Sequence, residues 1–249
     1  MSKQTANIKR FTRSRVGNFF YFTILFAAGL FTILPLIYSV ITSFKPLDEL
    51  LAFPPKFYVV RPTVSNYLAL PALLSKLSVP LSRYIFNSLF VSLITTVLHV
   101  IVASMASFVL VIWKKSKWIN ALFVIVQFSL LYNAYTLSIP QYLIFSETNI
   151  IDTYLVYILP YIPSALGVFL MKQYMESSIP DSLVEAARID GAGYFKTMFK
   201  VIIPLAKPSV ITVILFNFLS FWNEYIISMT LLTKPELKTL PVGLMNLMA

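Results

Sequence analysis

Five long stretches of this chain are almost free of charged side chains. An α-helix rises ~1.5 Å per residue, so ~20 residues cross a hydrocarbon core that is ~30 Å thick. In lipid the backbone must satisfy its own hydrogen bonds, and the alternation of a membrane β-barrel is absent here. The sequence therefore predicts an all-α integral membrane protein, a polytopic helical bundle. Five spans are visible, at about residues 18–43, 85–112, 118–142, 150–173 and 206–232.

The composition also favours lipid as the solvent. The chain has 249 residues and is 58% hydrophobic and 12% charged, whereas a soluble domain is about a quarter charged. Cysteine is absent and His99 is the only histidine, so no metal site, disulfide or catalytic constellation is predicted. The net charge of +10 could suggest a nucleic-acid partner, but the basic residues cluster between the apolar stretches. That placement indicates membrane topology, and no nucleic-acid partner is expected.

The distribution of lysine and arginine predicts the orientation of the chain. If residues 1–17 form a cytoplasmic N-terminus, thirteen basic residues fall in internal segments and seven in external ones. This excess follows the positive-inside rule. Residues 18–249 then form the transmembrane domain, and residues 44–84 form an extracellular loop, expected to be irregular because it holds six prolines. The first apolar stretch is too long for a signal peptide and is interpreted as a retained helix.

The segment 176–205 is too polar to span a membrane and too regularly patterned for a random linker. Ser178, with Asp181 three residues later, is typical of a capping box, and Pro180 then falls in the first helical turn. Two adjacent alanines, Ala186 and Ala187, leave room for a close neighbour. The pattern predicts the first helix of a cytoplasmic helix–turn–helix.

Two glycines are predicted to end that helix. Gly191 and Gly193 follow it directly, and glycine is the residue that most readily takes the left-handed conformation of a helix end. A second short helix is expected at about residues 194–201, and Pro204 is expected to end the unit. A short rigid element of this kind could dock on a partner and transmit motion, but an ordinary amphipathic surface helix has the same pattern.

The same segment resembles the loop signature of binding-protein-dependent ABC importer permeases, which reads E-A-A, three residues, G, nine residues, I-x-L-P. Glu185-Ala186-Ala187 and Gly191 match, Pro204 falls in register, and Val201 and Ile203 are conservative departures. Ile179-Pro180 and Asp190-Gly191 are typical of the carbohydrate branch and resemble the shorter permease of maltose-type transporters. Weaker matches lie at Thr42-Ser43-Phe44-Lys45, Asn66-Tyr67, Asn87-Ser88 and Trp222-Asn223.

The resemblance implies a permease subunit of an ATP-driven sugar or oligosaccharide importer in the bacterial inner membrane. Its implied partners are membrane lipid, a second homologous permease, a cytosolic ATPase dimer that holds ATP and Mg, and an extracellular solute-binding protein. The chain itself would hold no cofactor, because its six glycines build no phosphate loop of the G-x-x-x-x-G-K-[ST] kind. The implied ATPase-coupling residues are Glu185, Ala186, Ala187, Asp190 and Gly191, with Pro180, Gly193 and Pro204 shaping the loop. Such permeases usually have a sixth span after residues 240–244, which is expected but absent from this sequence.

Asn223 and Glu224 are candidates for the translocation pathway, because polar groups inside a span usually face protein or water. Glu224 could instead pair with the partner permease or lie at the outer interface. Other functions also stay open. The chain could be a permease for another solute, such as glycerol phosphate, an amino acid or a metal. It could be an ion-coupled secondary transporter, which should show mid-membrane carboxylates and inverted repeats. A membrane assembly protein would not need the helix–turn–helix signature.

Overall fold

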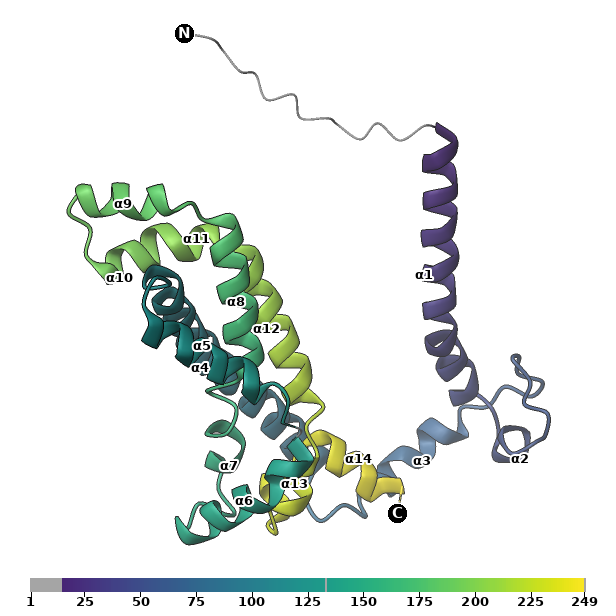
Figure 1. The fold of residues 1–249 in the computed structure, drawn as a ribbon. Helices are drawn as coiled ribbons and strands as arrows, with labels where there is room; N and C mark the ends of the chain where they lie inside the picture. The colour runs from purple at the N-terminus through teal and green to yellow at the C-terminus, as the bar shows by residue number, and fades with distance from the viewer. Residues whose placement is uncertain (1–14, 133, 249) are drawn as a thin grey trace. The chain divides into compact units, whose positions relative to one another are not determined.

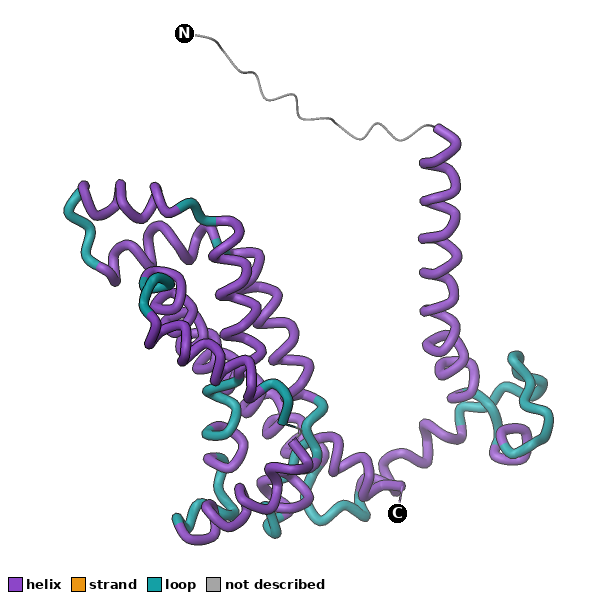
Figure 2. The backbone as a smooth tube through the Cα atoms, viewed as in Figure 1, coloured by secondary structure: helices purple, strands orange, loops and turns teal. Residues whose placement is uncertain are grey.

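The computed structural model describes residues 15–132 and 134–248, and none of these residues lies in a strand (Figure 2). The predicted all-α fold is confirmed. The chain divides into two compact units, Met1–Ala72 and Leu73–Ala249, which are considered one at a time. Most of the predicted cytoplasmic N-terminus, residues 1–14, lies outside the described residues.

The first unit holds one long apolar helix followed by a loop with two short ones. These are α1 (Arg15–Ser43), α2 (Leu47–Leu50) and α3 (Ser65–Leu74). α1 is apolar on all sides and buries none of its most apolar window, as expected for a helix whose solvent is lipid. The segment predicted to be an irregular loop therefore contains a ten-residue helix, α3.

Polar contacts order the loop between α1 and α3. The carboxylate of Glu49 accepts hydrogen bonds from the backbone N–H groups of Val60 and Arg61, at 2.8 and 3.2 Å. Asp48 forms an ion pair with the guanidinium of Arg61. Because both acids of α2 hold the same short segment, the proline-rich loop folds back on α2.

The second unit is a helical bundle around α4 (Figure 1). Its main helices are α4 (Leu81–Ile112), α5 (Lys117–Ser129), α6 (Ala134–Glu147), α7 (Leu155–Ile158), α8 (Ala165–Ser178), α12 (Lys207–Trp222), α13 (Ile226–Thr230) and α14 (Leu240–Met248). α4 packs along both α8 and α12. Its 32 residues correspond to ~48 Å, which is more than the ~30 Å needed to cross a hydrocarbon core.

Two apolar clusters hold this bundle together, one near each end of α4. The first includes Phe108, Met171, Met175, Met198, Ile202 and Val213, and the second includes Val91, Val156, Tyr157, Ile227 and Leu231. Lipid is as apolar as these side chains, so close packing and polar contacts, rather than burial itself, favour helix association in a bilayer.

Between the two clusters, α4 presents a buried polar stripe made of Ser92, Thr95, Thr96 and His99. His99 Nδ1 donates a hydrogen bond to the carbonyl of Ile162, at 2.8 Å. Ile162 lies in the break between α7 and α8, where two prolines supply no N–H donor. A carbonyl freed by such a break must find its partner within the protein, and His99 provides it.

Three of the predicted spans are interrupted. In place of single helices at 118–142, 150–173 and 206–232, the structure has the pairs α5 and α6, α7 and α8, and α12 and α13. Among the described residues, three stretches are long and apolar enough to cross a membrane: Val16–Ser43, Leu81–Ile112 and Lys207–Thr230, the last including the turn at 223–225. α5 is apolar but shorter.

Residues 231–239, which we term the strap, cross the bundle at the end opposite α9. The Asp152 carboxylate accepts a hydrogen bond from the Thr233 N–H at 2.7 Å and another from its hydroxyl. Asn87 Nδ2 donates to the carbonyl oxygens of Glu236 and Lys238, both at 2.8 Å. The turn at Asp152 and the start of α4 therefore hold the strap at two points.

Candidate functional site

Residues 181–205, which we term the hairpin, fold back at one end of the bundle (Figure 1). The hairpin contains α9 (Asp181–Ile189), α10 (Tyr194–Thr197), a π-helical turn (Met198–Ile202) and α11 (Ile203–Leu205). The helix–turn–helix predicted from the sequence is therefore present in outline, while its caps and its end differ from the prediction.

The predicted capping box is wrong. Ser178 is the last residue of α8, and the residue before α9 is Pro180, which makes no side-chain cap bond. Ile179 is extended, with φ −115° and ψ 106°, as the residue before a proline prefers to be. Because the chain leaves α8 in this extended form, Ser178 lies too early to cap α9.

Gly191 ends α9 in the left-handed conformation, with φ 73°. Its N–H donates to the Arg188 carbonyl at 3.0 Å, and the N–H of Ala192 donates to the Ala187 carbonyl at 2.9 Å. This pair of bonds is the Schellman motif, and it satisfies carbonyls that the helix end leaves free. Gly193, in contrast, has φ −66° and precedes α10 in ordinary extended backbone.

The second half of the hairpin is longer than predicted. A helix was expected at residues 194–201 with Pro204 as its end, but Pro204 lies inside α11. The π turn directly before it is wider than an α turn, and such turns accompany helix irregularities. The direction changes only at Ala206, and α12 begins at Lys207.

The coupling residues predicted from the sequence lie together on α9 and its end. Glu185, Ala186, Asp190 and Gly191 are exposed and Ala187 is half-buried. Val184 faces the core cluster beneath α9. The outer side of the hairpin also carries Ile189, which is 86% exposed, and Phe195, which is 69% exposed.

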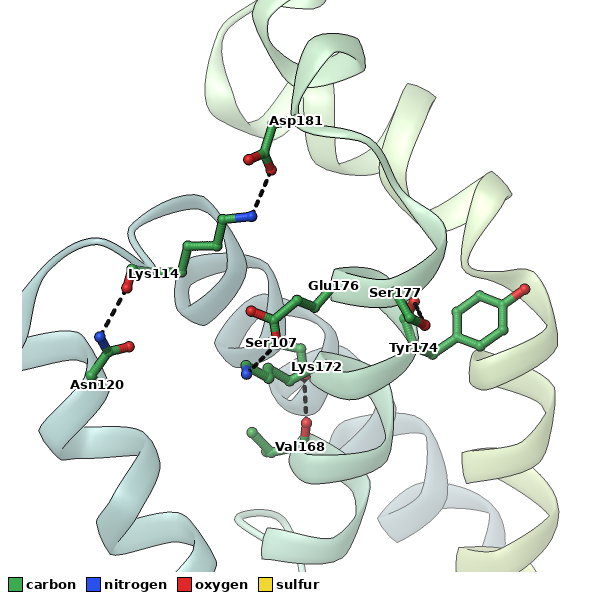
Figure 3. A network of polar contacts seen from close by, with 9 residues as sticks. All are labelled: Ser107, Lys114, Asn120, Val168, Lys172, Tyr174, Glu176, Ser177 and Asp181. Atoms are coloured by element: carbon green, nitrogen blue, oxygen red, sulfur yellow. Dashed lines mark hydrogen bonds and ion pairs between the residues drawn. The ribbon is translucent and has the colours of Figure 1, made fainter.

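An ion pair joins the start of α9 to the end of α4. Lys114 Nζ donates to Asp181 Oδ1 at 2.8 Å (Figure 3). This hydrogen bond lowers the pKa of Asp181 below its usual range and raises the pKa of Lys114. Asp181 loses its charge only below its lowered pKa, and Lys114 only above its raised one, so the pair stays ionised throughout the neutral range.

Aromatic contacts join the end of α9 to the same corner of α4. The Trp113 and Tyr194 ring centroids are 5.1 Å apart, and the Arg188 guanidinium lies 5.3 Å from the Tyr194 centroid. The sequence pattern assigned Lys114 and Arg188 to topology alone, among the internal basic residues, and did not single out Trp113. No local pattern could have found these contacts, because Lys114 and Asp181 are 67 positions apart.

Two cavities flank these contacts beneath the hairpin. A cavity of about 280 Å³ is lined by Trp113, Lys114, Asp181, Glu185 and Arg188, among others. A second, of about 270 Å³, is lined by residues that include Ile112, Val184, Gly193 and Tyr194. α9 therefore touches the bundle at a few points rather than along a continuous packed face.

The predicted pathway residues lie in the turn between α12 and α13 rather than within one helix. Glu224 Oε2 accepts a hydrogen bond from the Tyr161 hydroxyl at 2.6 Å, and Oε1 accepts one from the Ile227 N–H at 3.0 Å. Asn223 Nδ2 donates to the Leu219 carbonyl at 2.7 Å. Glu224 thus holds an N–H at the start of α13, whereas the Leu219 carbonyl also accepts the backbone N–H of Asn223, at 3.2 Å. Glu224 also lines a small cavity with Gln141.

The described residues hold no group of three metal-ligating side chains. The acids of the hairpin and of the α12–α13 turn each contact basic, hydroxyl or backbone partners or face solvent. The described part of the site therefore consists of exposed side chains and of contacts that join the hairpin to the end of α4.

Two permease proteins are similar in sequence over most of this chain. The sulfoquinovosyl glycerol transport system permease protein SmoH of Agrobacterium fabrum is 32% identical over 89% of this chain and 75% of its own length. The arabinooligosaccharides transport system permease protein AraQ of Bacillus subtilis is 32% identical over 67% of this chain and 59% of its own length.

A further relative and a solved structure widen the comparison. The sn-glycerol-3-phosphate transport system permease protein UgpE of Shigella flexneri is 29% identical over 69% of this chain and 60% of its own length. In the crystal structure of a bacterial ABC transporter involved in the import of the acidic polysaccharide alginate, one chain matches with a TM-score of 0.75 and 26% identity. The match covers 94% of this chain and 81% of that one.

The family model described as binding-protein-dependent transport system inner membrane component matches residues 5–246. This match extends well beyond the hairpin to nearly the whole sequence, and the relatives named above are transport system permease proteins. The resemblance drawn from the loop signature is thereby confirmed. The chain belongs to the family of binding-protein-dependent transport system inner membrane components.

Proposed function

We propose that this chain is a membrane-spanning permease subunit of an ATP-driven importer for a sugar or oligosaccharide, and that it couples to a cytosolic ATPase through the hairpin. One observation carries the proposal: the Glu185-Ala186-Ala187 helix, ended by Gly191, stands exposed at one end of a membrane bundle. The chain would form half of the translocation path, and a second homologous permease would form the other half.

The surface of the hairpin supports a docking role. Ile189 and Phe195 are large apolar side chains exposed at the end of a bundle that carries the charged groups Lys114, Asp181 and Arg188 around them. This end is the cytoplasmic one in the orientation predicted by the positive-inside rule. Apolar side chains exposed there are away from lipid, and contact with a partner protein would bury them.

The substrate class rests on the relatives. Two of the similar permeases are named for sulfoquinovosyl glycerol and for arabinooligosaccharides, and the structural neighbour imports a polysaccharide. Two relatives are named for sn-glycerol-3-phosphate, so a phosphorylated polyol is the second candidate. A carbohydrate is favoured because more of the similar proteins are named for one.

An ion-coupled secondary transporter has less support. Such a carrier needs titratable groups that can bind and release the coupling ion in mid-membrane. The Glu224 carboxylate is the acidic group of the described spans that lies inside the bundle, and it accepts bonds from Tyr161 and Ile227. As part of the importer proposal, Asn223 and Glu224 contribute to the translocation pathway from the turn between α12 and α13.

The implied partners and cofactors follow from the proposed assembly. ATP and Mg would bind to the ATPase dimer, and an extracellular solute-binding protein would deliver the sugar. The chain would lie in the inner membrane with its N-terminus in the cytoplasm.

Reconstitution tests the proposal. The chain is co-expressed with the second permease and the ATPase encoded beside it and placed in proteoliposomes with ATP inside. Uptake of labelled sugars, oligosaccharides and glycerol phosphate is then measured with the cognate binding protein outside. We expect uptake of one carbohydrate that requires ATP and is insensitive to ionophores. Uptake that an ion gradient drives without ATP would contradict the proposal, and ATP-driven uptake of glycerol phosphate alone would replace its substrate class.

A further inference from the structure

The residues that follow α4 contact the hairpin on either side of α9. Trp113 and Lys114 directly follow α4. Lys114 binds Asp181, the first residue of α9, while Trp113 stacks on Tyr194, the first residue of α10 just beyond the end of α9. Two neighbouring residues therefore contact the hairpin on either side of the helix that carries the coupling signature.

The Lys114 contact is built on a fixed support. The Lys114 carbonyl oxygen accepts a hydrogen bond from Asn120 Nδ2 at 2.9 Å, which ties the corner to α5 (Figure 3). The Lys114 side chain is 32% exposed and that of Asp181 60% exposed. An ion pair this accessible changes an equilibrium only about fivefold at most, so it acts by orienting α9 and not by anchoring it alone.

The contact between Trp113 and Tyr194 is the second link between this corner of α4 and the hairpin. The Tyr194 ring contacts both Trp113, with centroids 5.1 Å apart, and the Arg188 guanidinium, 5.3 Å from its centroid. Arg188 belongs to the last turn of α9, so this stack joins α4, α9 and α10 in one place. The cavities of about 280 and 270 Å³ lie beside this contact, and the other contacts of the hairpin with the bundle are apolar ones, made by Val184, Met198 and Ile202.

The other end of α4 holds the strap. Asn87 bonds the carbonyls of Glu236 and Lys238, and the Leu240 N–H donates to Ser88 Oγ at 2.8 Å. α4 is continuous from this end to Trp113, ~48 Å of helix. A displacement of its hairpin end would therefore reach the strap through one unbroken element.

We propose that Trp113 and Lys114 are positioning residues that form a two-point link between α9 and α4, transmitting movement of the hairpin along α4 to the strap. This inference rests on the proposed function, since it concerns how the hairpin would act once an ATPase is docked on it. It assigns coupling to two residues outside the loop signature.

A charge swap tests the first contact. The full complex, with wild-type or variant chain, is reconstituted, and the amount of solute imported per ATP hydrolysed is measured. Lys114→Glu should lower this ratio about fivefold, and so should Asp181→Lys, while Lys114→Glu/Asp181→Lys together should return to within about twofold of wild type. Lys117→Glu makes the same charge change three residues later, at the start of α5, where no ion pair with α9 is formed, and should leave the ratio unchanged.

The aromatic contact has its own pair of variants. Trp113→Ala should lower the ratio about as much as Lys114→Glu, and Trp113→Phe should retain it because a ring still stacks on Tyr194. Copurification of the ATPase is scored for every variant. Loss of assembly in the single variants that the charge swap restores would also support the link, because a merely unfolded chain is not rescued by a second charge reversal.

Other outcomes would overturn the link. It fails if the double variant is no better than the single ones, or if Lys114→Glu matches Lys117→Glu in a complex that imports solute normally. If the wild-type complex shows no ATP-driven uptake at all, the proposed function fails instead. The two failures are therefore distinguished by the wild-type measurement.

Discussion

Gly191 is the residue where backbone geometry most restricts the side chain of the coupling signature. At φ 73° a β-branched residue costs about 1–2 kcal/mol, whereas asparagine tolerates this conformation. We expect Gly191→Val to lower import per ATP about tenfold and Gly191→Asn to lower it much less. Gly193→Ala is the matched control, since Gly193 has φ −66° and open space where the alanine methyl group would lie. Equal effects of the Val and Asn substitutions would show that the left-handed turn does not matter.

At Gly167 a larger residue is excluded by neighbouring atoms and not by the backbone angle φ. A Cβ there would lie 1.9 Å from His99 Nε2, whereas at Gly29 no atom lies within 4 Å. Gly167→Ala should therefore destabilise the protein by about 1–3 kcal/mol, and Gly29→Ala should not. Thermal unfolding in nanodiscs measures both. The cost of Gly167→Ala should fall in a His99→Ala background, and an unchanged cost would mean that the ring is not the obstacle.

At the scale of elements, the break between α12 and α13 is organised by Glu224. Its carboxylate accepts bonds from Tyr161 and from the Ile227 N–H in α13. Glu224→Ala should destabilise the fold by about 1–3 kcal/mol, while Glu224→Gln keeps an acceptor and should cost less. Tyr161→Phe removes one of the two bonds and should fall between them. Unfolding measurements check this order, and transport with unchanged solute affinity in Glu224→Gln would remove the pathway role of the carboxylate.

Helix existence was more predictable than helix continuity. α1 and α4 follow from long uninterrupted apolar runs, which have few alternatives in lipid. The breaks beside α8 and α13 did not follow, because prolines and a carboxylate inside a span are compatible with either a kinked helix or two helices. Whether a span breaks depends on whether side chains such as His99 and Tyr161 can hydrogen-bond to groups at the break. These side chains come from distant positions in the sequence.

In the hairpin, too, some features could be predicted from the sequence and others could not. The left-handed end at Gly191 was predictable from glycine chemistry, and the structure has it. The cap at Ser178 was not correct, because α8 extends through that residue and Pro180 occupies the position directly before α9. The contacts of Trp113 and Lys114 could not be predicted, since they depend on how two distant helices end beside each other.

At the scale of the whole molecule, the orientation is the next prediction to test. The chain has no cysteine, so single cysteines can be introduced without altering any native thiol. Ser116→Cys and Ser182→Cys should react with an impermeant maleimide only from the cytoplasmic side. Thr148→Cys and Lys234→Cys should react only from outside. The reverse pattern would place the hairpin outside the cell and rule out its coupling to a cytosolic ATPase.

The central claim is that the hairpin binds the ATPase, and site-specific photo-crosslinking tests it most directly. A photoreactive residue at position 189, where Ile189 is 86% exposed, is compared with one at Thr148, which is exposed near the other end of the bundle. In the active assembled complex, the account predicts a crosslink to the ATPase from position 189 and none from position 148. An active complex that gives no ATPase crosslink from position 189, or gives one from position 148, would contradict the account.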